Sequence, residues 1–138
     1  MTIHPQLEKD CLLLGCLELS YVLLMKDANY PWLILVPAVE GVSEIYQLSV
    51  SQQQQLLAES SFIAENMMAH FQGRKMNIAA LGNIVPQLHL HHVVRYEDDP
   101  AWPAPVWGKH AAKAYTEAQL TERVDELKAL FAERLRPV

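Results

Sequence analysis

The chain has 138 residues, of which 51% are hydrophobic and 20% are charged, and its formal net charge is −5. This length and composition are typical of one globular domain with a sizeable core, so residues 1–138 are treated as a single domain. The acidic balance argues against a general nucleic-acid binder, which would present a basic face, but it does not exclude a small anionic ligand. No apolar run approaches the roughly 20 residues of a membrane span, so no membrane partner is expected.

The cysteines and the first residues bear on the compartment. Cys11 and Cys16 stand five residues apart, which is too close to staple much of the chain. No basic segment followed by an apolar run marks a secretory signal peptide. These observations favour a reducing, cytoplasmic location.

The first third of the chain predicts an antiparallel hairpin. Residues 1–10 are expected to form a loop or a short turn, and a short apolar run after them is broken by Gly15. Residues 17–25 and 32–36 are expected to form two strands, because both are rich in β-formers and apolar residues. The Asp, Asn and Pro residues between them are typical of a turn.

A long helix is predicted to follow this hairpin. Residues 52–71 contain no Gly or Pro and carry an apolar stripe at helical spacing. Ser51 and Gln54 have the spacing of an N-terminal capping box. Gly73 is expected to end the helix.

The second half predicts another hairpin and a last helix. Residues 75–81 and 87–95 read as two strands joined by a turn at Gly82–Asn83. Residues 95–110 are irregular and hold two Trp among several Pro residues, a composition expected to cap a hydrophobic surface, or to contact a base or a partner subunit. A capping box at Thr116 begins an amphipathic C-terminal helix. Hairpins without parallel crossovers predict an α+β fold, with an antiparallel sheet, a long central helix and a C-terminal helix.

The most informative stretch is 87–95, which holds three of the six histidines. Read as a strand, it directs Gln87, His89 and His91 to one face, and residues that are apolar except for His92 to the other. Successive same-face positions lie about 6.6 Å apart, so two imidazoles can both reach one phosphate or one metal ion.

Three interpretations of this strand are open. The histidines are polar filler on an exposed face, or they bind a metal with a third ligand from His110, Asp98 or Asp99, or they perform phosphate chemistry. The metal interpretation lacks any HExxH or CxxC spacing in the sequence. Phosphate chemistry needs a neutral imidazole as nucleophile, and the reference pKa of an imidazole, about 6.5, allows this near pH 7.

The order of residues here resembles the histidine triad, or HIT, family. Its signature is His-x-His-x-His followed by two apolar residues, with an Asn and a Gly some distance before it. Asn77 and Gly82 precede the pattern Gln87-x-His89-x-His91 in the matching order. The departure is at the first triad position, where Gln87 replaces the family's histidine.

The resemblance implies a HIT-like antiparallel fold and an enzyme that hydrolyses or transfers nucleotides at the α-phosphate of a nucleoside phosphate ester, anhydride or phosphoramidate. His89 would be the nucleophile that carries the nucleotidyl group, and His91 would hold the phosphate oxygens. Gln87 can donate a hydrogen bond but cannot carry a proton. If this position must protonate the leaving group, activity falls about 10²- to 10⁴-fold, and Gln87→His would raise the rate most for amine leaving groups.

The resemblance also implies where the substrate binds and what the protein needs. Asn77, Gly82 and Asn83 would contact the phosphate or sugar, and Asp27 would accept hydrogen bonds from the ribose. No metal and no other cofactor is expected, and the partners are a small nucleotide and a second copy of the chain in a homodimer. Two alternatives stay open, namely a catalytically weak nucleotide-binding module, favoured by Gln87, and a metal-binding protein.

Overall fold

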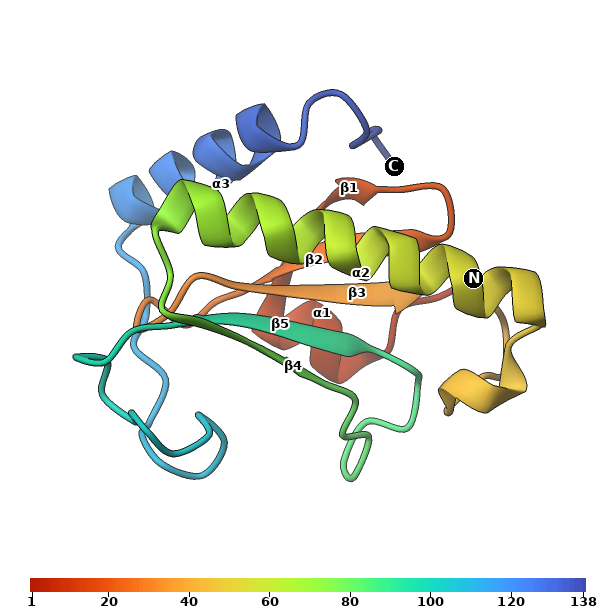
Figure 1. The fold of residues 1–138 in the computed structure, drawn as a ribbon, viewed down its shortest axis with the longest axis horizontal. Coiled ribbons are helices and arrows are strands. Elements are labelled where there is room, and N and C mark those ends of the chain that lie inside the picture. The colour runs from red at the N-terminus through yellow and green to blue at the C-terminus, as the bar shows by residue number, and fades with distance from the viewer.

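A five-stranded antiparallel sheet forms the centre of the protein in a computed structural model, which describes residues 1–138 (Figure 1). All four strand pairings are antiparallel, as the alternation of hairpins predicts. Across the sheet the order is β1 (Cys11–Cys16), β2 (Ser20–Met25), β3 (Trp32–Pro37), β5 (Leu90–Arg95) and β4 (Lys75–Ala79). The α+β class with a long central helix and a C-terminal helix is confirmed.

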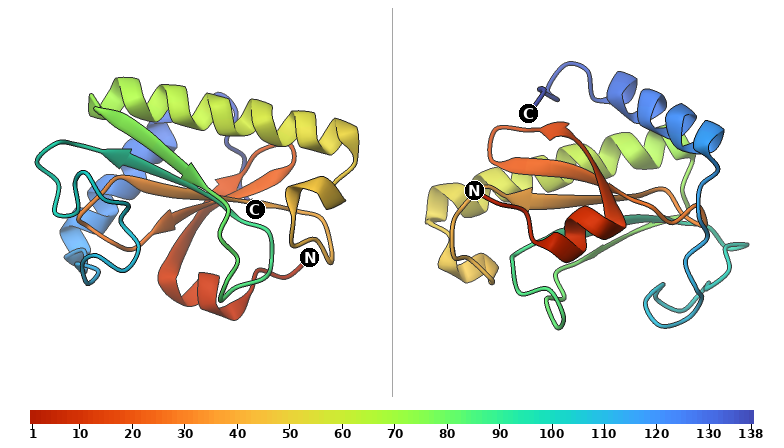
Figure 2. Two further views of the ribbon diagram at one scale, coloured as in Figure 1. Left: turned by 60° about the horizontal axis from the view of Figure 1, so that its bottom comes forward. Right: turned by 180° about the vertical axis from the view of Figure 1, so that it is seen from behind.

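Helices cover both faces of this sheet. The long helix α2 (Val50–Phe71) and the C-terminal helix α3 (Glu117–Leu130) lie on one face, and the short helix α1 (Pro5–Asp10) lies on the other (Figure 2). A 3₁₀ turn, η1 (Ile45–Gln47), precedes α2. No helix of the structure combines the length and the apolar character needed to cross a bilayer.

The expectation of a loop over residues 1–10 is wrong, because α1 occupies residues 5–10. Pro5 stands at the first helical position, and the Nδ1 atom of His4 accepts a hydrogen bond from the backbone N–H of Gln6 at 3.0 Å. These two features suffice to begin a helix of only six residues, which is too short to show hydrophobic periodicity. Leu7 is its one buried side chain.

Alternation along the central strands gives the protein two cores. One core lies between the sheet and α2 with α3, and it includes Leu33 and Val94. The other lies between the sheet and α1 with the segment after β5, and it includes Ile34 and Val93. Strand β3 is therefore buried on both faces, and the histidine face of β5 is covered. The interpretation of the histidines as filler on an exposed face is wrong.

Helix α2 begins two residues earlier than predicted. Its cap is Ser49, whose side chain accepts from the N–H of Gln52, while the Gln52 side chain accepts from the N–H of Ser49. Ser51 and Gln54 have the same spacing, so the sequence offers two overlapping capping boxes. The earlier box is used, and Ser51 lies inside the helix.

The end of α2 is also set one residue away from the predicted glycine. Gln72, not Gly73, takes the left-handed conformation, with φ of 49°. Gly73 is required for space, because a Cβ there would lie 2.6 Å from Cγ1 of Val94 on β5. The close approach of the chain to β5 therefore explains this glycine.

Strand boundaries differ from the prediction in a way that matters for the site. The run after residue 10 is a true strand, β1, and a bulge between Leu13 and Gly15 lets it continue past the glycine. The predicted strand over 87–95 begins only at Leu90, so His89 lies just before β5.

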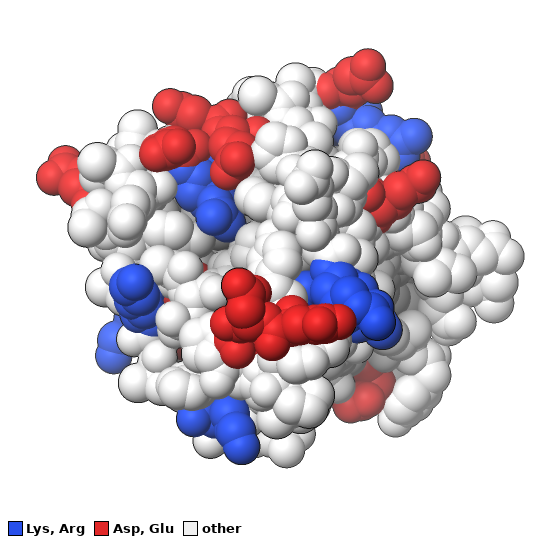
Figure 3. Space-filling model, turned by 60° about the vertical axis from the view of Figure 1, so that its left-hand side comes forward, with Lys and Arg blue, Asp and Glu red and all other residues white.

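Charged side chains of both signs are interspersed on the face shown in Figure 3. His70 on α2 lies 2.9 Å from Glu126 on α3, which agrees with the surface role that a histidine near a helix end is expected to have. Leu127 and Phe131 are buried against the domain, so α3 packs on its own chain.

Candidate active site

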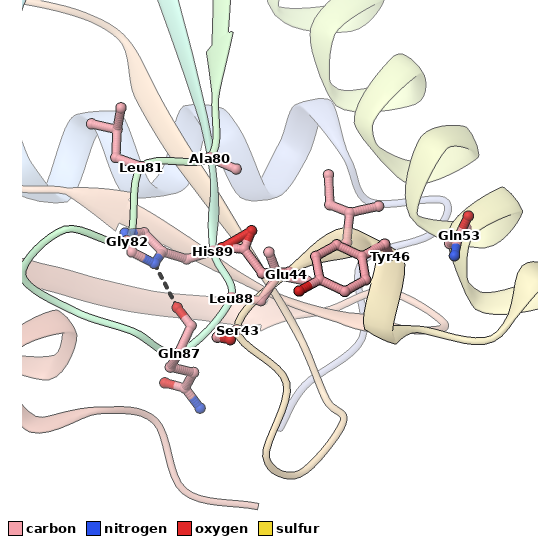
Figure 4. A pocket seen from close by; sticks show the side chains of 11 residues that line it. Ser43, Glu44, Tyr46, Gln53, Ala80, Leu81, Gly82, Gln87, Leu88 and His89 are labelled. Carbon is pink, nitrogen blue, oxygen red and sulfur yellow. Dashed lines mark hydrogen bonds between the residues drawn. The ribbon is translucent and has the colours of Figure 1, made fainter.

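His89 presents a free ring nitrogen. Its Nδ1 atom lies 2.7 Å from the backbone oxygen of Gln87, which Figure 4 shows as a dashed line. A carbonyl oxygen can only accept, so Nδ1 carries the hydrogen. In the neutral ring this leaves the lone pair on Nε2, and a lone pair on nitrogen is what a nucleophile requires.

His91 presents the opposite group. The indole Nε1–H of Trp32 donates to Nδ1 of His91 at 3.0 Å, so the hydrogen of the neutral imidazole is on Nε2. Burial, with smaller contributions from the neighbouring His89 and His92, lowers the pKa of His91 to about 3. The ring therefore stays neutral near pH 7. The centroids of the His89 and His91 rings are 4.9 Å apart, so a lone pair and an N–H are available side by side.

His92 points to the other face of the sheet and has a structural role. Its Nδ1–H donates to the backbone oxygen of Leu90 at 3.0 Å, and its Nε2 lies 2.7 Å from the Ser60 hydroxyl of α2. The side chain is fully buried, and this burial lowers its pKa to about 4. His92 thus ties α2 to β5 and does not face a cavity.

These buried neutral histidines predict an acid-sensitive fold. In the unfolded chain both His91 and His92 take up protons below about pH 6.5, while the folded protein keeps them neutral to about pH 3 and 4. The free energy of unfolding should therefore fall as the pH drops below 6.5, by up to about 1.4 kcal/mol per pH unit for each histidine.

Urea unfolding at pH 7, 6 and 5 of the wild type and of His92→Asn measures this dependence. The variant should lose the slope that one proton contributes. An identical slope in both proteins would show that His92 is not kept neutral by the fold.

An apolar cavity of about 410 Å³ opens beside the two histidines. His89 and His91 line it together with side chains from α1, β2, β3 and the loops on either side of β5. The apolar part of this wall comes from Leu7, Met25, Trp32, Ile34, Val85 and Trp107. Trp107 lies edge-on to both Trp32 and His91, with ring centroids 5.9 and 5.1 Å apart.

A second cavity, of about 350 Å³, meets the first at His89 (Figure 4). It is more polar, because η1 and its flanks contribute Ser43, Glu44 and Tyr46. Leu81, Gly82 and His89 line both cavities. His89 therefore lies where an apolar and a polar compartment join.

Most of the predicted site residues come together here. Five of them line at least one of the two cavities, namely Gly82, Asn83, Gln87, His89 and His91. The loop turn at Gly82–Asn83 is placed against the histidines, as the resemblance implies.

Asn77 and Asp27 line neither cavity. The side-chain oxygen of Asn77 accepts from Nη1 of Arg95 at 2.8 Å. One carboxylate oxygen of the buried Asp27 accepts from the backbone N–H groups of Asn29 and Lys113, at 3.0 and 3.2 Å. Both side chains thus hold loops in place.

Sequence reasoning missed several residues that line the cavities. Asp10 and Gln6 come from α1, and the Gln6 amide donates to the Asp10 carboxylate at 2.9 Å. Trp107 was expected to cap a hydrophobic surface, and it does so against Trp32. Glu44 carries no local motif, and only the fold brings it to His89.

The third ligand required by the metal interpretation is not brought to the two histidines. Asp99, one of its predicted sources, is bound by Arg95 through two hydrogen bonds of 2.8 and 3.0 Å. The structure contains no group of three His, Cys, Asp or Glu side chains arranged to hold a metal ion.

Comparison with known proteins places the chain in a family. A sequence model of the HIT domain matches residues 6–98, about two thirds of the chain. The chain belongs to the histidine triad family. A search of curated protein sequences finds no match.

Solved structures of histidine triad proteins share the whole fold. The protein from Marinobacter aquaeolei VT8 is 53% identical, with a TM-score of 0.93 over 96% of this chain and 97% of that one. The protein from Bradyrhizobium japonicum is 39% identical, with a TM-score of 0.90 over 98% of each chain. The protein from Sinorhizobium meliloti 1021 is 38% identical, with a TM-score of 0.89 over 97% and 96%.

Proposed function

We propose that this histidine triad protein hydrolyses or transfers nucleotides by attack of His89 on the α-phosphorus of a nucleoside phosphate ester, anhydride or phosphoramidate. The observation that carries the proposal is the pair of rings described above. His89 offers a lone pair on Nε2, and His91 offers a hydrogen on Nε2. A nucleophile next to a neutral donor suits a tetrahedral phosphate, whose oxygens gain charge as the attack proceeds.

The reaction proceeds in two displacements. The Nε2 lone pair of His89 forms a bond to phosphorus, and the bond to the leaving group breaks with its electron pair. The Nδ1 hydrogen stays on the Gln87 carbonyl, which stabilises the positive charge of the modified ring. Water or another acceptor then attacks phosphorus, the N–P bond breaks, and the electron pair returns to Nε2. The proton lost by water balances the leaving group.

The two cavities would divide the substrate. The nucleoside would enter the apolar cavity, where Trp32 and Trp107 offer aromatic surface to a base. The leaving group would enter the polar cavity beside Glu44. With phosphorus at His89, the loop at Gly82 and Asn83 would border the phosphate from both sides.

For the ribose we propose Asp10 in place of Asp27. A carboxylate can accept hydrogen bonds from both sugar hydroxyls. The Asp27 carboxylate is buried and already accepts two backbone hydrogen bonds, whereas Asp10 is half-buried and lines the apolar cavity. Asp10 keeps one carboxylate oxygen free of its bond with Gln6.

A homodimer in a reducing, cytoplasmic location is also proposed. The edge strand β4 has one unpaired side, and apolar side chains on and after it are exposed, with Ile84 88% accessible. Exposed apolar side chains beside an open edge suit contact with another chain. The free thiols of Cys11 and Cys16 suit a reducing compartment. Light scattering at micromolar concentration would give the mass of one chain if the dimer proposal is wrong.

A second candidate is a nucleotide-binding module that turns over slowly, because the first triad position is Gln87. Incubation with a panel of adenosine and guanosine esters, anhydrides and phosphoramidates separates the two functions. Release of the mononucleotide with kcat in the ordinary enzyme range would support the hydrolase. Binding by calorimetry without product release would support the module, and the absence of both would overturn the proposed function.

A further inference from the structure

The backbone that carries His89 is not held by the sheet. The ladder of β5 with β3 ends at the pair Leu35–Leu90, and its ladder with β4 ends at His91. His89 comes before both ends. The backbone N–H of Leu88 donates to the oxygen of Val42 at 3.0 Å, and this bond alone does not fix the residue before it.

The side chain of Gln87 supplies the missing anchor. Its Oε1 accepts from the backbone N–H of His4 at 2.8 Å, and its Nε2 donates to the backbone oxygen of Thr2 at 2.9 Å. The amide thus pairs with the N-terminal segment much as a neighbouring strand would. Figure 4 shows this amide directed away from the His89 ring.

The N-terminal segment is itself well fixed. Ile3 lies between the two bonded residues, is 8% exposed, and belongs to the core that also contains Leu7. Helix α1 follows directly and forms one wall of the apolar cavity. The anchor therefore connects Gln87 to a packed part of the protein.

We propose that the N-terminal segment, residues 2–4, positions the nucleophile through Gln87. The same residue uses its side chain to bind the segment and its backbone oxygen to hold Nδ1–H of His89. Fixing Gln87 thus fixes both the direction and the tautomer of the His89 ring. Gln87 is a positioning residue, and its amide does not contact the leaving group. This inference rests on the proposed function for its kinetic consequence only.

The proposal changes the expectation for restoring the triad. An imidazole at position 87 cannot both accept from the His4 N–H and donate to the Thr2 oxygen with the geometry of a primary amide. Gln87→His should therefore lower kcat for aryl and amine leaving groups alike. A selective gain on amine leaving groups would instead show that position 87 acts on the leaving group.

A matched pair of substitutions at His4 tests the anchor without touching Gln87. His4 has φ of −54° and ψ of 136°, which a proline adopts without strain. His4→Pro deletes the backbone N–H that donates to Gln87, whereas His4→Ala keeps it. Both variants lose the side-chain cap of α1, so their difference isolates the one hydrogen bond.

Kinetics of His4→Pro, His4→Ala, Gln87→Met and the double variant His4→Pro/Gln87→Met give the first readout. We expect His4→Pro and Gln87→Met each to lower kcat about 10- to 100-fold with little change in KM, and His4→Ala to stay within about twofold of wild type. The double variant should be no slower than the slower single variant, because both changes break one connection. Multiplicative effects, or a fully active His4→Pro, would overturn the proposal.

The ring nitrogens of His89 give a second readout that needs no turnover. In wild type, ¹⁵N chemical shifts should show the Nδ1–H tautomer alone, and His4→Pro and Gln87→Met should show a mixture of tautomers. A single Nδ1–H tautomer in all variants would overturn the positioning role. If wild type hydrolyses none of the nucleotides, the proposed function fails, while these shifts still decide whether the anchor fixes His89.

Discussion

Replacing His89 by alanine is expected to lower kcat/KM for nucleotide hydrolysis by about four orders of magnitude or more, because no other free nucleophilic nitrogen faces both cavities. The fold should survive, since the side chain borders open space and its one hydrogen bond is to the nearby Gln87 carbonyl. Steady-state kinetics and thermal unfolding of the same preparation check both statements.

His110→Ala is the matched control for this loss. His110 is exposed and lines neither cavity, so its removal should leave kcat/KM unchanged. Activity of His89→Ala within tenfold of wild type would remove His89 from the nucleophile role. His91→Ala should retain more activity, because a single hydrogen-bond donor contributes about 3 to 4 kcal/mol at most.

Replacing Arg95 by methionine is expected to destabilise the protein by about 3 to 5 kcal/mol, because it strands a buried carboxylate. The side chains of Arg95 and Asp99 are 1% and 2% exposed and form two hydrogen bonds with each other. Burial by itself would raise the pKa of Asp99, but bonds from Arg95 and from backbone N–H groups lower it. The carboxylate therefore stays charged when its partner is removed.

Urea unfolding at pH 7 measures this effect, and the chain offers two controls. Arg74→Met breaks an exposed ion pair with Glu97, both side chains being more than 60% accessible, and should change stability by less than about 0.5 kcal/mol. Arg95→Met combined with Asp99→Leu removes both charges and should recover part of the loss. Equal stabilities of Arg95→Met and Arg74→Met would contradict the assignment of a buried ion pair.

This ion pair connects to the site through the loop after β5. Asp99 also accepts from the backbone N–H groups of Ala101 and Trp102, which fixes the start of that loop. The loop continues to Trp107, which packs on Trp32 and His91. Loosening it should therefore reduce nucleotide affinity as well as stability.

The fold was largely predictable because its main elements carry long periodic patterns. The apolar stripe of α2 and the alternation along β3 and β5 report burial directly, and Met67 is fully buried as core filler. Helix α1 has only six residues and one buried side chain, so no period exists to be detected. The start of α2 was misplaced because Ser49 and Ser51 both fit a capping box.

The chemistry of the site was predictable where the residues are close in sequence. His89 and His91 share a face whatever the exact start of the strand, because side-chain direction alternates. Asp27 and Asn77 were misplaced as contacts because their polar groups are taken by Lys113 and Arg95, which lie far away in the chain. The anchor between Gln87 and the N-terminal segment spans more than 80 residues, and no local pattern indicates it.

The covalent intermediate on His89 is the most direct test of the proposed chemistry. An adenosine phosphoramidate or aryl ester would be mixed with the protein, quenched in denaturant at alkaline pH within milliseconds to seconds, and analysed by intact mass and peptide mapping. We expect a transient gain of one nucleoside monophosphoryl group, located on His89 and absent from His89→Ala. Turnover without any such adduct, or an adduct on another residue, would contradict nucleophilic attack by His89.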